Sequence, residues 1–287
     1  MRIDVINCGA MRPYGGRLWD GITPGLGASC LALRCLLAET VDGLVLVDTG
    51  VGLQDVAHPA PRLSPVFRFA DRVQLDPTDT AVARVRALGH DPADVRHIVM
   101  THLDFDHAGG LSDFPSAAIH VHAVEAQAAR ERSGLIASQR YRPAQLPPTM
   151  REHDARDGTM TWMGLDAIGR QHGLPPGILF VPLPGHTRGH CGVALDTGAG
   201  WVLHAGDAVF MHSELEHADD CPPLSSTYQG VMEVDRTARR ASADQLRGLA
   251  RRRGAEVAIL CTHDPITPRG DSRYQVGLEA DPKPRGV

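Results

Sequence analysis

The chain has 287 residues, of which 43% are hydrophobic and 22% are charged, a balance that fits a folded globular protein and excludes long disorder. Its 34 acidic and 29 basic residues give a formal net charge of −5, which argues against binding nucleic acid through phosphates. No apolar run reaches the ~18 residues that a membrane span needs, and Asp4 and Asn7 interrupt the stretch where a signal peptide would be apolar. We therefore expect a cytoplasmic protein that begins at Met1, with neither nucleic acid nor a membrane as a partner.

Short apolar runs bounded by glycine, proline or aspartate predict nine buried strands: Ile3–Cys8, Cys30–Ala38, Leu44–Asp48, His97–Thr101, Ile119–His122, Leu179–Leu183, Gly192–Asp196, Trp201–His204 and Glu256–Cys261. Helical spacing of apolar residues predicts four helices: Asp79–Leu88, Ala123–Arg132, Thr161–Gln171 and Ala241–Arg253. Strands, then a helix, then strands occur twice along the chain. We therefore expect one α/β domain over residues 1–287, made of two similar halves whose sheets pack face to face.

Two stretches are expected to be irregular, His58–Asp76 and Ser133–Pro176. Long loops in a compact domain are often lids or binding elements, although a plain surface insertion is the alternative. The second stretch contains Trp162 and several methionines, which suit an adaptable apolar wall for a substrate. We expect residues 133–176 to form a lid or insertion.

A dense group of polar residues follows the predicted strand that ends at Thr101. His102, Asp104, Asp106 and His107 fall within six positions, while apolar residues alternate between them. Four such groups held close together would repel or desolvate one another unless a cation lay among them. The segment therefore predicts a metal site.

Further potential ligands follow later strands, and each of them by itself would be a weak signal. His186 and His190 follow the strand that ends at Leu183, Asp207 and the less convincing His204 follow the next, and His263 follows the last. Strand ends that each deliver a histidine or an aspartate indicate one metal centre at a shared sheet edge.

These motifs resemble those of the metallo-β-lactamase-fold hydrolase superfamily, whose hallmark is a His-x-His-x-Asp-His loop followed by a His, an Asp and a His. The resemblance extends from Ile3 to Pro265 and includes Val47-Asp-Thr-Gly50, the Gly-His-Thr-x-Gly-His segment and the Gly-Asp pair. It implies a four-layer αββα sandwich with the site at one edge of the paired sheets.

The resemblance also implies two divalent metal ions. One would be held by His102, Asp104 and His186, and the other by Asp106, His107 and His263, with Asp207 bridging both. Zinc is the usual metal of the family. The family usually has a histidine where this chain has Asp104. This oxygen donor makes the first site harder and more negative, and therefore less suited to zinc and better suited to iron or manganese.

His190 is expected to support the ligand His186, and Asp48 to orient the His102 loop through hydrogen bonds. Six further histidines carry no pattern that lifts them above a structural or solvated role: His97, His120, His122, His204, His212 and His217. The arginine-rich stretch from Arg236 to Arg253 is typical of the polar face of an amphipathic helix.

Two bridged cations would lower the pKa of a shared water, and the resulting hydroxide would attack a carbonyl. Asp106 or Asp207 would accept and pass on the proton. The loop and the chain length are most similar to N-acyl-homoserine lactonases, whose tyrosine three residues beyond the bridging aspartate corresponds to Phe210 here. Tyr228 or Tyr141 would have to replace it. We therefore predict hydrolysis of a small carboxylic ester or lactone, which makes a small molecule the main partner.

Three alternatives remain open: a glyoxalase-II-like thioesterase, a redox protein similar to flavodiiron proteins, and a metal-binding protein without hydrolytic activity. An RNA-processing activity is disfavoured by the acidic net charge. A homodimer is also left open, because dimers are common in the family that the chain resembles.

Overall fold

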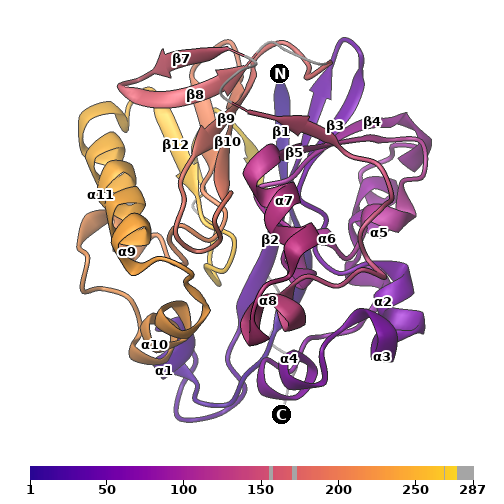
Figure 1. Ribbon diagram of the computed structural model, residues 1–287. Coiled ribbons are helices and arrows are strands. Elements are labelled where there is room, and N and C mark those ends of the chain that lie inside the picture. Colours follow the sequence, from indigo (N-terminus) through magenta and orange to yellow (C-terminus); the bar gives the residue numbers. More distant parts are fainter. Residues whose placement is uncertain (155–157, 170–172, 268, 277–287) are drawn as a thin grey trace.

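The computed structural model describes residues 1–154, 158–169, 173–267 and 269–276. In these residues two sheets lie face to face, with helices on their outer faces (Figure 1). The first sheet has the order β13 (Gln275–Val276), β1 (Arg2–Met11), β2 (Leu31–Thr40), β3 (Gly43–Val47), β4 (Val95–Val99), β5 (Ala118–His122) and β6 (Arg151–His153). The second has the order β12 (Val257–Leu260), β11 (Trp201–His204), β10 (Cys191–Asp196), β9 (Ile178–Pro182), β8 (Leu165–Gly169) and β7 (Thr159–Trp162).

Both sheets are mixed. In the first, β1, β2 and β3 pair antiparallel, whereas β3, β4, β5 and β6 run parallel. In the second, β11 and β12 are parallel and the other pairs are antiparallel. All nine predicted strands are confirmed, with ends displaced by no more than three residues.

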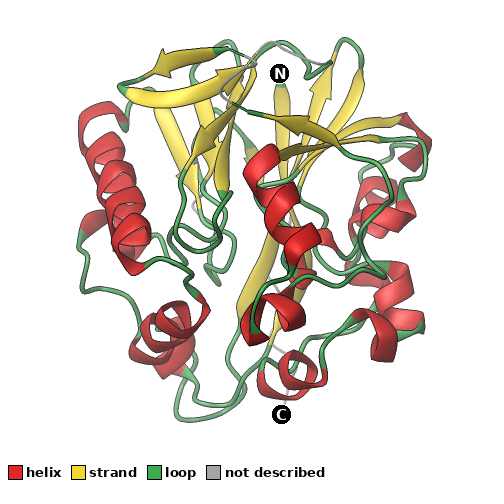
Figure 2. Cartoon of the chain, viewed as in Figure 1, coloured by secondary structure: helices red, strands yellow, loops and turns green. Residues whose placement is uncertain are grey.

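Helices cover the outer face of each sheet, and further helices lie beyond the lower ends of the sheets in the view of Figure 2. Their bounds are α1 (Arg17–Asp20), α2 (Leu53–Ala57), α3 (Pro59–Arg62), α4 (Pro65–Ala70), α5 (Ala81–Ala87), α6 (Phe105–Ala108), α7 (Ala123–Glu131), α8 (Leu135–Arg140), α9 (Ser213–Glu216), α10 (Pro223–Met232) and α11 (Arg236–Arg253). Short 3₁₀ turns cover η1 (Pro77–Asp79), η2 (Pro92–Asp94) and η3 (Leu111–Asp113). Three of the four predicted helices are confirmed, as α5, α7 and α11. No described helix is both long and apolar enough to cross a membrane.

Apolar residues fill the three spaces between the four layers. One cluster joins the first sheet to α5 and α7 through residues such as Val82, Val85 and Ala126. A second lies between the sheets, where Val47 and Phe180 are fully buried. A third joins the second sheet to α11 and α9. The predicted αββα sandwich is therefore confirmed.

Helix α11 shows how the sequence pattern produces the outer layer. Asp235 caps its first turn by accepting a hydrogen bond from the amide of Ala238 at 2.9 Å, which starts the helix five residues earlier than predicted. Ala243, Leu246 and Leu249 recur every third position and are buried against the second sheet. The other arginines of α11 occupy the remaining face as predicted, but Arg247 is buried and donates a hydrogen bond to the carbonyl of Glu214 at 3.1 Å.

The predicted helix Thr161–Gln171 is wrong where the structure describes it, and residues 170 and 171 lie outside the described part. The segment forms the hairpin β7–β8 instead. Met163 and Gly164 connect the strands with φ angles of 51° and 88°, the left-handed pair that a tight two-residue hairpin turn requires. The alternation of buried and exposed side chains is that of a strand and not of a helix, because Leu165 and Ala167 are buried and Asp166 between them is exposed.

The expected irregular stretches contain more regular structure than predicted. His58–Asp76 forms α3 and α4, and the described part of Ser133–Pro176 supplies α8, β6, β7 and β8. Trp162 is 4% exposed and packs edge-on against Trp201, with ring centroids 5.3 Å apart. This side chain therefore belongs to the core beneath α11 and not to a substrate wall. A lid role for the rest of residues 133–176 stays a prediction.

Candidate metal centre

The seven predicted ligands meet at one edge of the sandwich, although they come from four separate segments. His102, Asp104, Asp106 and His107 follow β4 and enter α6, and the others follow β9, β11 and β12. All seven are buried: His102, Asp104, Asp106, His107, His186, Asp207 and His263. Because each segment leaves its strand at the same edge, residues up to 161 positions apart in the sequence become neighbours.

The first group contains two histidines and two aspartates. The Nε2 atom of His186 lies 3.0 Å from Asp104 Oδ2 and 3.5 Å from Asp207 Oδ2. The Nε2 atom of His102 lies 3.6 Å and 3.9 Å from the same two oxygens. Donors bound at ~2.1 Å around one tetrahedral ion would be about 3.4 Å apart, so this spacing fits a shared cation.

The second group contains Asp106, His107 and His263, again with Asp207. The Nε2 atom of His107 lies 3.3 Å from Asp207 Oδ1 and 3.8 Å from Asp106 Oδ2. The Nε2 atom of His263 lies 3.1 Å from Asp207 Oδ2 and 3.7 Å from Asp106 Oδ2. Asp207 thus faces both groups, which is the position expected of a bridging ligand.

Several donor atoms in this cluster are buried without a hydrogen-bond partner, namely His102 Nε2, His107 Nε2 and Asp207 Oδ1. A buried polar atom without a partner costs about 1–3 kcal/mol, so atoms left unpaired at a common point require something that binds them all. Cations would satisfy them. The residues present therefore fit two divalent metal ions.

The charges of the cluster support the same conclusion. Burial by itself would lower the pKa of His107, but the carboxylates of Asp207, Asp106 and Asp48 outweigh it and raise the pKa well above its usual value. The pKa of His263 is likewise raised, because Asp207 and Asp106 outweigh the effect of burial. The carboxylates thus favour positive charge at the positions that cations would occupy.

Hydrogen bonds outside the donor set fix the orientation of the imidazoles. Asp48 Oδ2 is 2.8 Å from His107 Nδ1, and Asp48 also accepts hydrogen bonds from the amide and hydroxyl of Thr101. His263 Nδ1 lies 2.9 Å from the carbonyl of Ala32. These contacts leave the Nε2 atoms directed at the centre. The predicted role of Asp48 is therefore confirmed, and its left-handed φ of 57° reflects how tightly the loop is held there.

His190 supports the site, but its target differs from the prediction. Its Nδ1 atom bonds the carbonyl of Leu183 at 2.9 Å, and its Nε2 atom accepts from the amide of Asp207 at 2.8 Å. It therefore orients the backbone of Asp207 and makes no hydrogen bond to His186. Burial and the nearby His102 and His186 lower the pKa of His190 well below its usual value, which keeps it neutral. His204 has a structural role, with both ring nitrogens bonded to backbone groups.

Sequence reasoning missed Glu125, which lies on α7 and is fully buried. Its carboxylate accepts hydrogen bonds from the amide of Leu103, the hydroxyls of Tyr141 and Thr187, and the amide of Gly189. It therefore ties the loop after β4 to the loop after β9. The sequence gives no signal for this role, because the residue occupies an ordinary helical position.

The hydrogen bond from Tyr141 to Glu125 helps to decide which tyrosine could replace the lactonase tyrosine, whose position is occupied by Phe210 here. Tyr141 is 3% exposed and its hydroxyl is held by this carboxylate, so it is not available to a substrate. Phe210 packs edge-on against the ring of His263, with centroids 4.6 Å apart. The ring centroids of Tyr228 and Phe210 are 6.3 Å apart, and the hydroxyl of Tyr228 donates a hydrogen bond to Asp71 at 2.9 Å. Both hydroxyls are thus held by carboxylates, but Tyr228 is only partly buried and packs beside Phe210, so of the two it lies nearer the position of the lactonase tyrosine.

Arg140 is the second residue that the sequence did not reveal. It ends α8, is fully buried, and its Nε atom lies 3.4 Å from Asp104 Oδ1. Burial would raise the pKa of Asp104, but Arg140 and then His102 hold it well below its usual value. Asp104 is therefore charged and paired.

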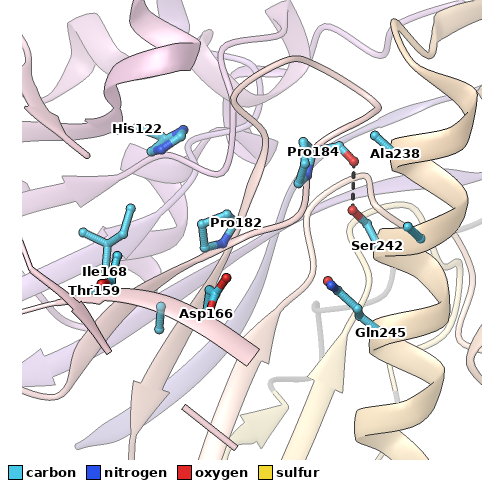
Figure 3. Close-up of a pocket in the computed structure, with 11 residues that line it drawn as sticks. His122, Thr159, Asp166, Ile168, Pro182, Pro184, Ala238, Ser242 and Gln245 are labelled. Carbon is cyan, nitrogen blue, oxygen red and sulfur yellow. Dashed lines mark hydrogen bonds between the residues drawn. The ribbon is translucent and has the colours of Figure 1, made fainter. Parts of the chain in front are cut away.

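A separate pocket of about 370 Å³ lies between α11 and the strands β8 and β9 (Figure 3). Its lining includes His122, Asp166 and Gln245 but none of the seven candidate ligands. Ser242 closes one side by donating a hydrogen bond to the carbonyl of Pro184 at 2.8 Å. This pocket is therefore distinct from the candidate metal centre.

A four-layer αββα sandwich with histidines and aspartates gathered at one sheet edge defines a class of metal-dependent hydrolases. Residues 30–263 match the model of the metallo-beta-lactamase superfamily, and the chain belongs to this superfamily. A probable metallo-hydrolase of Mycobacterium tuberculosis is 38% identical over 269 residues, which cover 92% of this chain and 81% of that protein. An N-acyl homoserine lactonase of Bacillus cereus is 27% identical over 203 residues, or 70% of this chain and 72% of that one.

Solved structures show the same fold. An N-acyl homoserine lactone hydrolase with the product N-hexanoyl-L-homoserine bound at its catalytic metal center superposes with a TM-score of 0.63 and 24% identity, covering 92% of this chain and 93% of that one. A dizinc quorum-quenching lactonase superposes with a TM-score of 0.59 and 16% identity, covering 90% and 86%. At these identities the likeness establishes the fold. The chain is thus a metallo-hydrolase with lactonase-like structural neighbours.

Proposed function

We propose that this metallo-hydrolase cleaves a small carboxylic ester or lactone with two divalent metal ions, zinc being the first choice. The observation that carries the proposal is the set of inward-facing donors, in which Asp207 faces both histidine groups. Two ions held there would supply Lewis acidity and lower the pKa of a water to near neutrality. The 27% identity to an N-acyl homoserine lactonase supports the lactone subclass.

The chain's own residues have separate roles in this proposal. Asp106 has a 7% exposed side chain, the largest value among the seven ligands, so it is the carboxylate best placed to exchange a proton with a substrate. The backbone amide of Asp207 donates a hydrogen bond to His190, and its carboxylate orients the two groups of metal ligands relative to each other. Tyr228, beside Phe210, is proposed to contact the substrate in place of the lactonase tyrosine.

The test begins with the metal content of the purified, unchelated protein and continues with a substrate panel. N-hexanoyl homoserine lactone, δ-valerolactone and p-nitrophenyl acetate represent the proposed class. S-D-lactoylglutathione and bis(p-nitrophenyl) phosphate represent thioesters and phosphoesters. We expect about two metal ions per chain and hydrolysis of a lactone or ester. Turnover of the thioester or phosphoester only would replace the proposal, and absence of metal after reconstitution would end it.

A matched pair of variants connects the activity to the site. Asp106→Asn removes a proposed ligand and proton acceptor, and we expect turnover to fall at least about a hundredfold. Asp166→Asn makes the same chemical change on the exposed face of β8, and we expect no loss. Equal activities for the two variants would contradict the proposed role of Asp106. The cytoplasmic location and the homodimer stay predictions.

A further inference from the structure

The carboxylate of Asp104 has two oxygens in different surroundings. Oδ2 lies 3.0 Å from Nε2 of the ligand His186, whereas Oδ1 faces away from the ligands and lies 3.4 Å from Arg140 Nε. Neither Asp104 Oδ1 nor Arg140 Nε has a hydrogen-bond partner, so the ion pair is the principal contact of both atoms. Asp104 therefore connects a candidate metal position to a buried positive charge.

Arg140 is held in place from the opposite side. Its two terminal nitrogens donate to the backbone carbonyls of His186, at 3.0 Å, and of Met232. The side chain is 1% exposed, so its charge is screened very little by water. A buried guanidinium costs several kcal/mol unless it is paired, and within the described contacts Asp104 is the carboxylate that pairs with it.

We propose that Arg140 is the positioning and charge-balancing partner of Asp104, so that the two residues together replace the neutral histidine that the family usually has at this position. Asp104, Asp106 and Asp207 give the site one more negative charge than two aspartates would, and Arg140 cancels that extra charge. The inference rests on the metal-binding part of the proposed function.

The pair changes the expectation for the metal. The oxygen donor remains, but the additional negative charge that favours a harder ion is offset by the guanidinium. Zinc is therefore compatible with the first group despite the change from histidine to aspartate. Loss of Arg140 is expected to shift the first group toward manganese or iron.

The test is a double-mutant cycle of four proteins: the native chain, Asp104→His, Arg140→Met and the combination of both changes. Zinc per chain is measured after dialysis against a competing chelator, and the melting temperature is measured on the metal-free proteins. Each single variant leaves one buried charge unpaired, and we expect Asp104→His to weaken zinc binding about 10–100-fold. The double variant restores a neutral donor without a neighbouring cation, so zinc content and metal-free stability are expected to recover.

Arg62 offers a matched control. It is also a buried arginine, paired with Asp55 at 2.6 Å and bonded to the carbonyls of Gly109 and Ala144, but it does not contact Asp104. Combining Arg62→Met with Asp104→His should rescue nothing. Arg140→Lys keeps the charge while losing the planar contacts, and it is expected to retain more zinc than Arg140→Met.

The outcomes separate the two proposals. If the native chain binds no metal, the proposed function fails. If the native chain binds two ions but the effects of Asp104→His and Arg140→Met are additive in the double variant, Arg140 only holds the loops together and the pairing is disproved. Recovery in the double variant, without recovery in the Arg62 combination, supports the pairing.

Discussion

Two groups of histidines lie in the same sandwich and behave in opposite ways. All of their members are buried except His97, which is half-buried. One is the metal centre, with His102, His107, His186 and His263. The other is a chain of three imidazoles on neighbouring parallel strands, which we call the histidine chain. In it, His97 Nδ1 lies 3.0 Å from His120 Nε2, and His120 Nδ1 lies 2.9 Å from His153 Nε2.

The difference lies in the partners of the ring nitrogens. In the histidine chain, the nitrogens of His120 meet other imidazoles, and burial together with His153 and His97 lowers its pKa to about 3. At the metal centre, His102 Nε2 and His107 Nε2 have no hydrogen-bond partner, and carboxylates raise the pKa of His107. Buried histidines thus indicate a cation site only where carboxylates accompany them and their nitrogens face a common point.

Among the changes that test this difference between the two histidine groups, removal of the Asp207 carboxylate should have the largest effect on metal content and turnover. Asp207→Asn keeps the shape of the side chain but removes the charge that faces both histidine groups. We expect the loss of at least one metal ion per chain and a decrease in turnover of at least about a hundredfold. Elemental analysis and steady-state kinetics measure both. His153→Gln in the histidine chain should leave the metal content unchanged, and two retained ions in Asp207→Asn would remove the distinction between the groups.

Removal of metal should destabilise the protein through the metal centre only. One free metal ion at 100 times its Kd stabilises the folded state by about 2.7 kcal/mol, which corresponds to a shift in Tm of about 4–5 °C for a domain of 287 residues. Calorimetry with and without a chelator measures the shift. The same shift is expected in His120→Gln, because the candidate cation sites of the described residues do not include the histidine chain. A chelator shift that disappears in His120→Gln would show that the two groups are not independent.

The smallest effect is the pH dependence that the histidine chain contributes. His120 has a folded-state pKa of about 3 against 6.5 for the ordinary residue, so the unfolded chain takes up the proton first as the pH falls. Stability is therefore lost as the pH decreases below 6.5, with about 1.4 kcal/mol lost by pH 5.5. Urea unfolding of the chelated native protein at pH 7.5 and 5.5 measures this loss. In chelated His120→Gln the loss should be smaller by that amount, whereas an equal loss would show that His120 does not contribute.

Most of the fold follows from local patterns. Runs such as Leu179–Leu183 are too apolar and too short to be anything but buried strands, and Val82 and Val85 mark one face of α5. In the hairpin β7–β8 the local pattern is ambiguous, because the spacing of Trp162 and Leu165 suits a helix as well as a strand pair. Pairing with β9 at the sheet edge decided between them.

The sequence by itself predicted the seven candidate ligands: strand ends and residue types marked the candidates, and the resemblance to the superfamily separated these seven from His190 and His204. The tertiary structure decided what surrounds them. His190 acts on Asp207, Glu125 joins two loops, and Arg140 meets Asp104 because α8 brings the guanidinium to a loop 36 residues away in the chain. Ligands are recognisable from their chemistry and from the strands that precede them. Their supporting residues are ordinary helical and loop positions, whose roles arise only from the packing of distant segments.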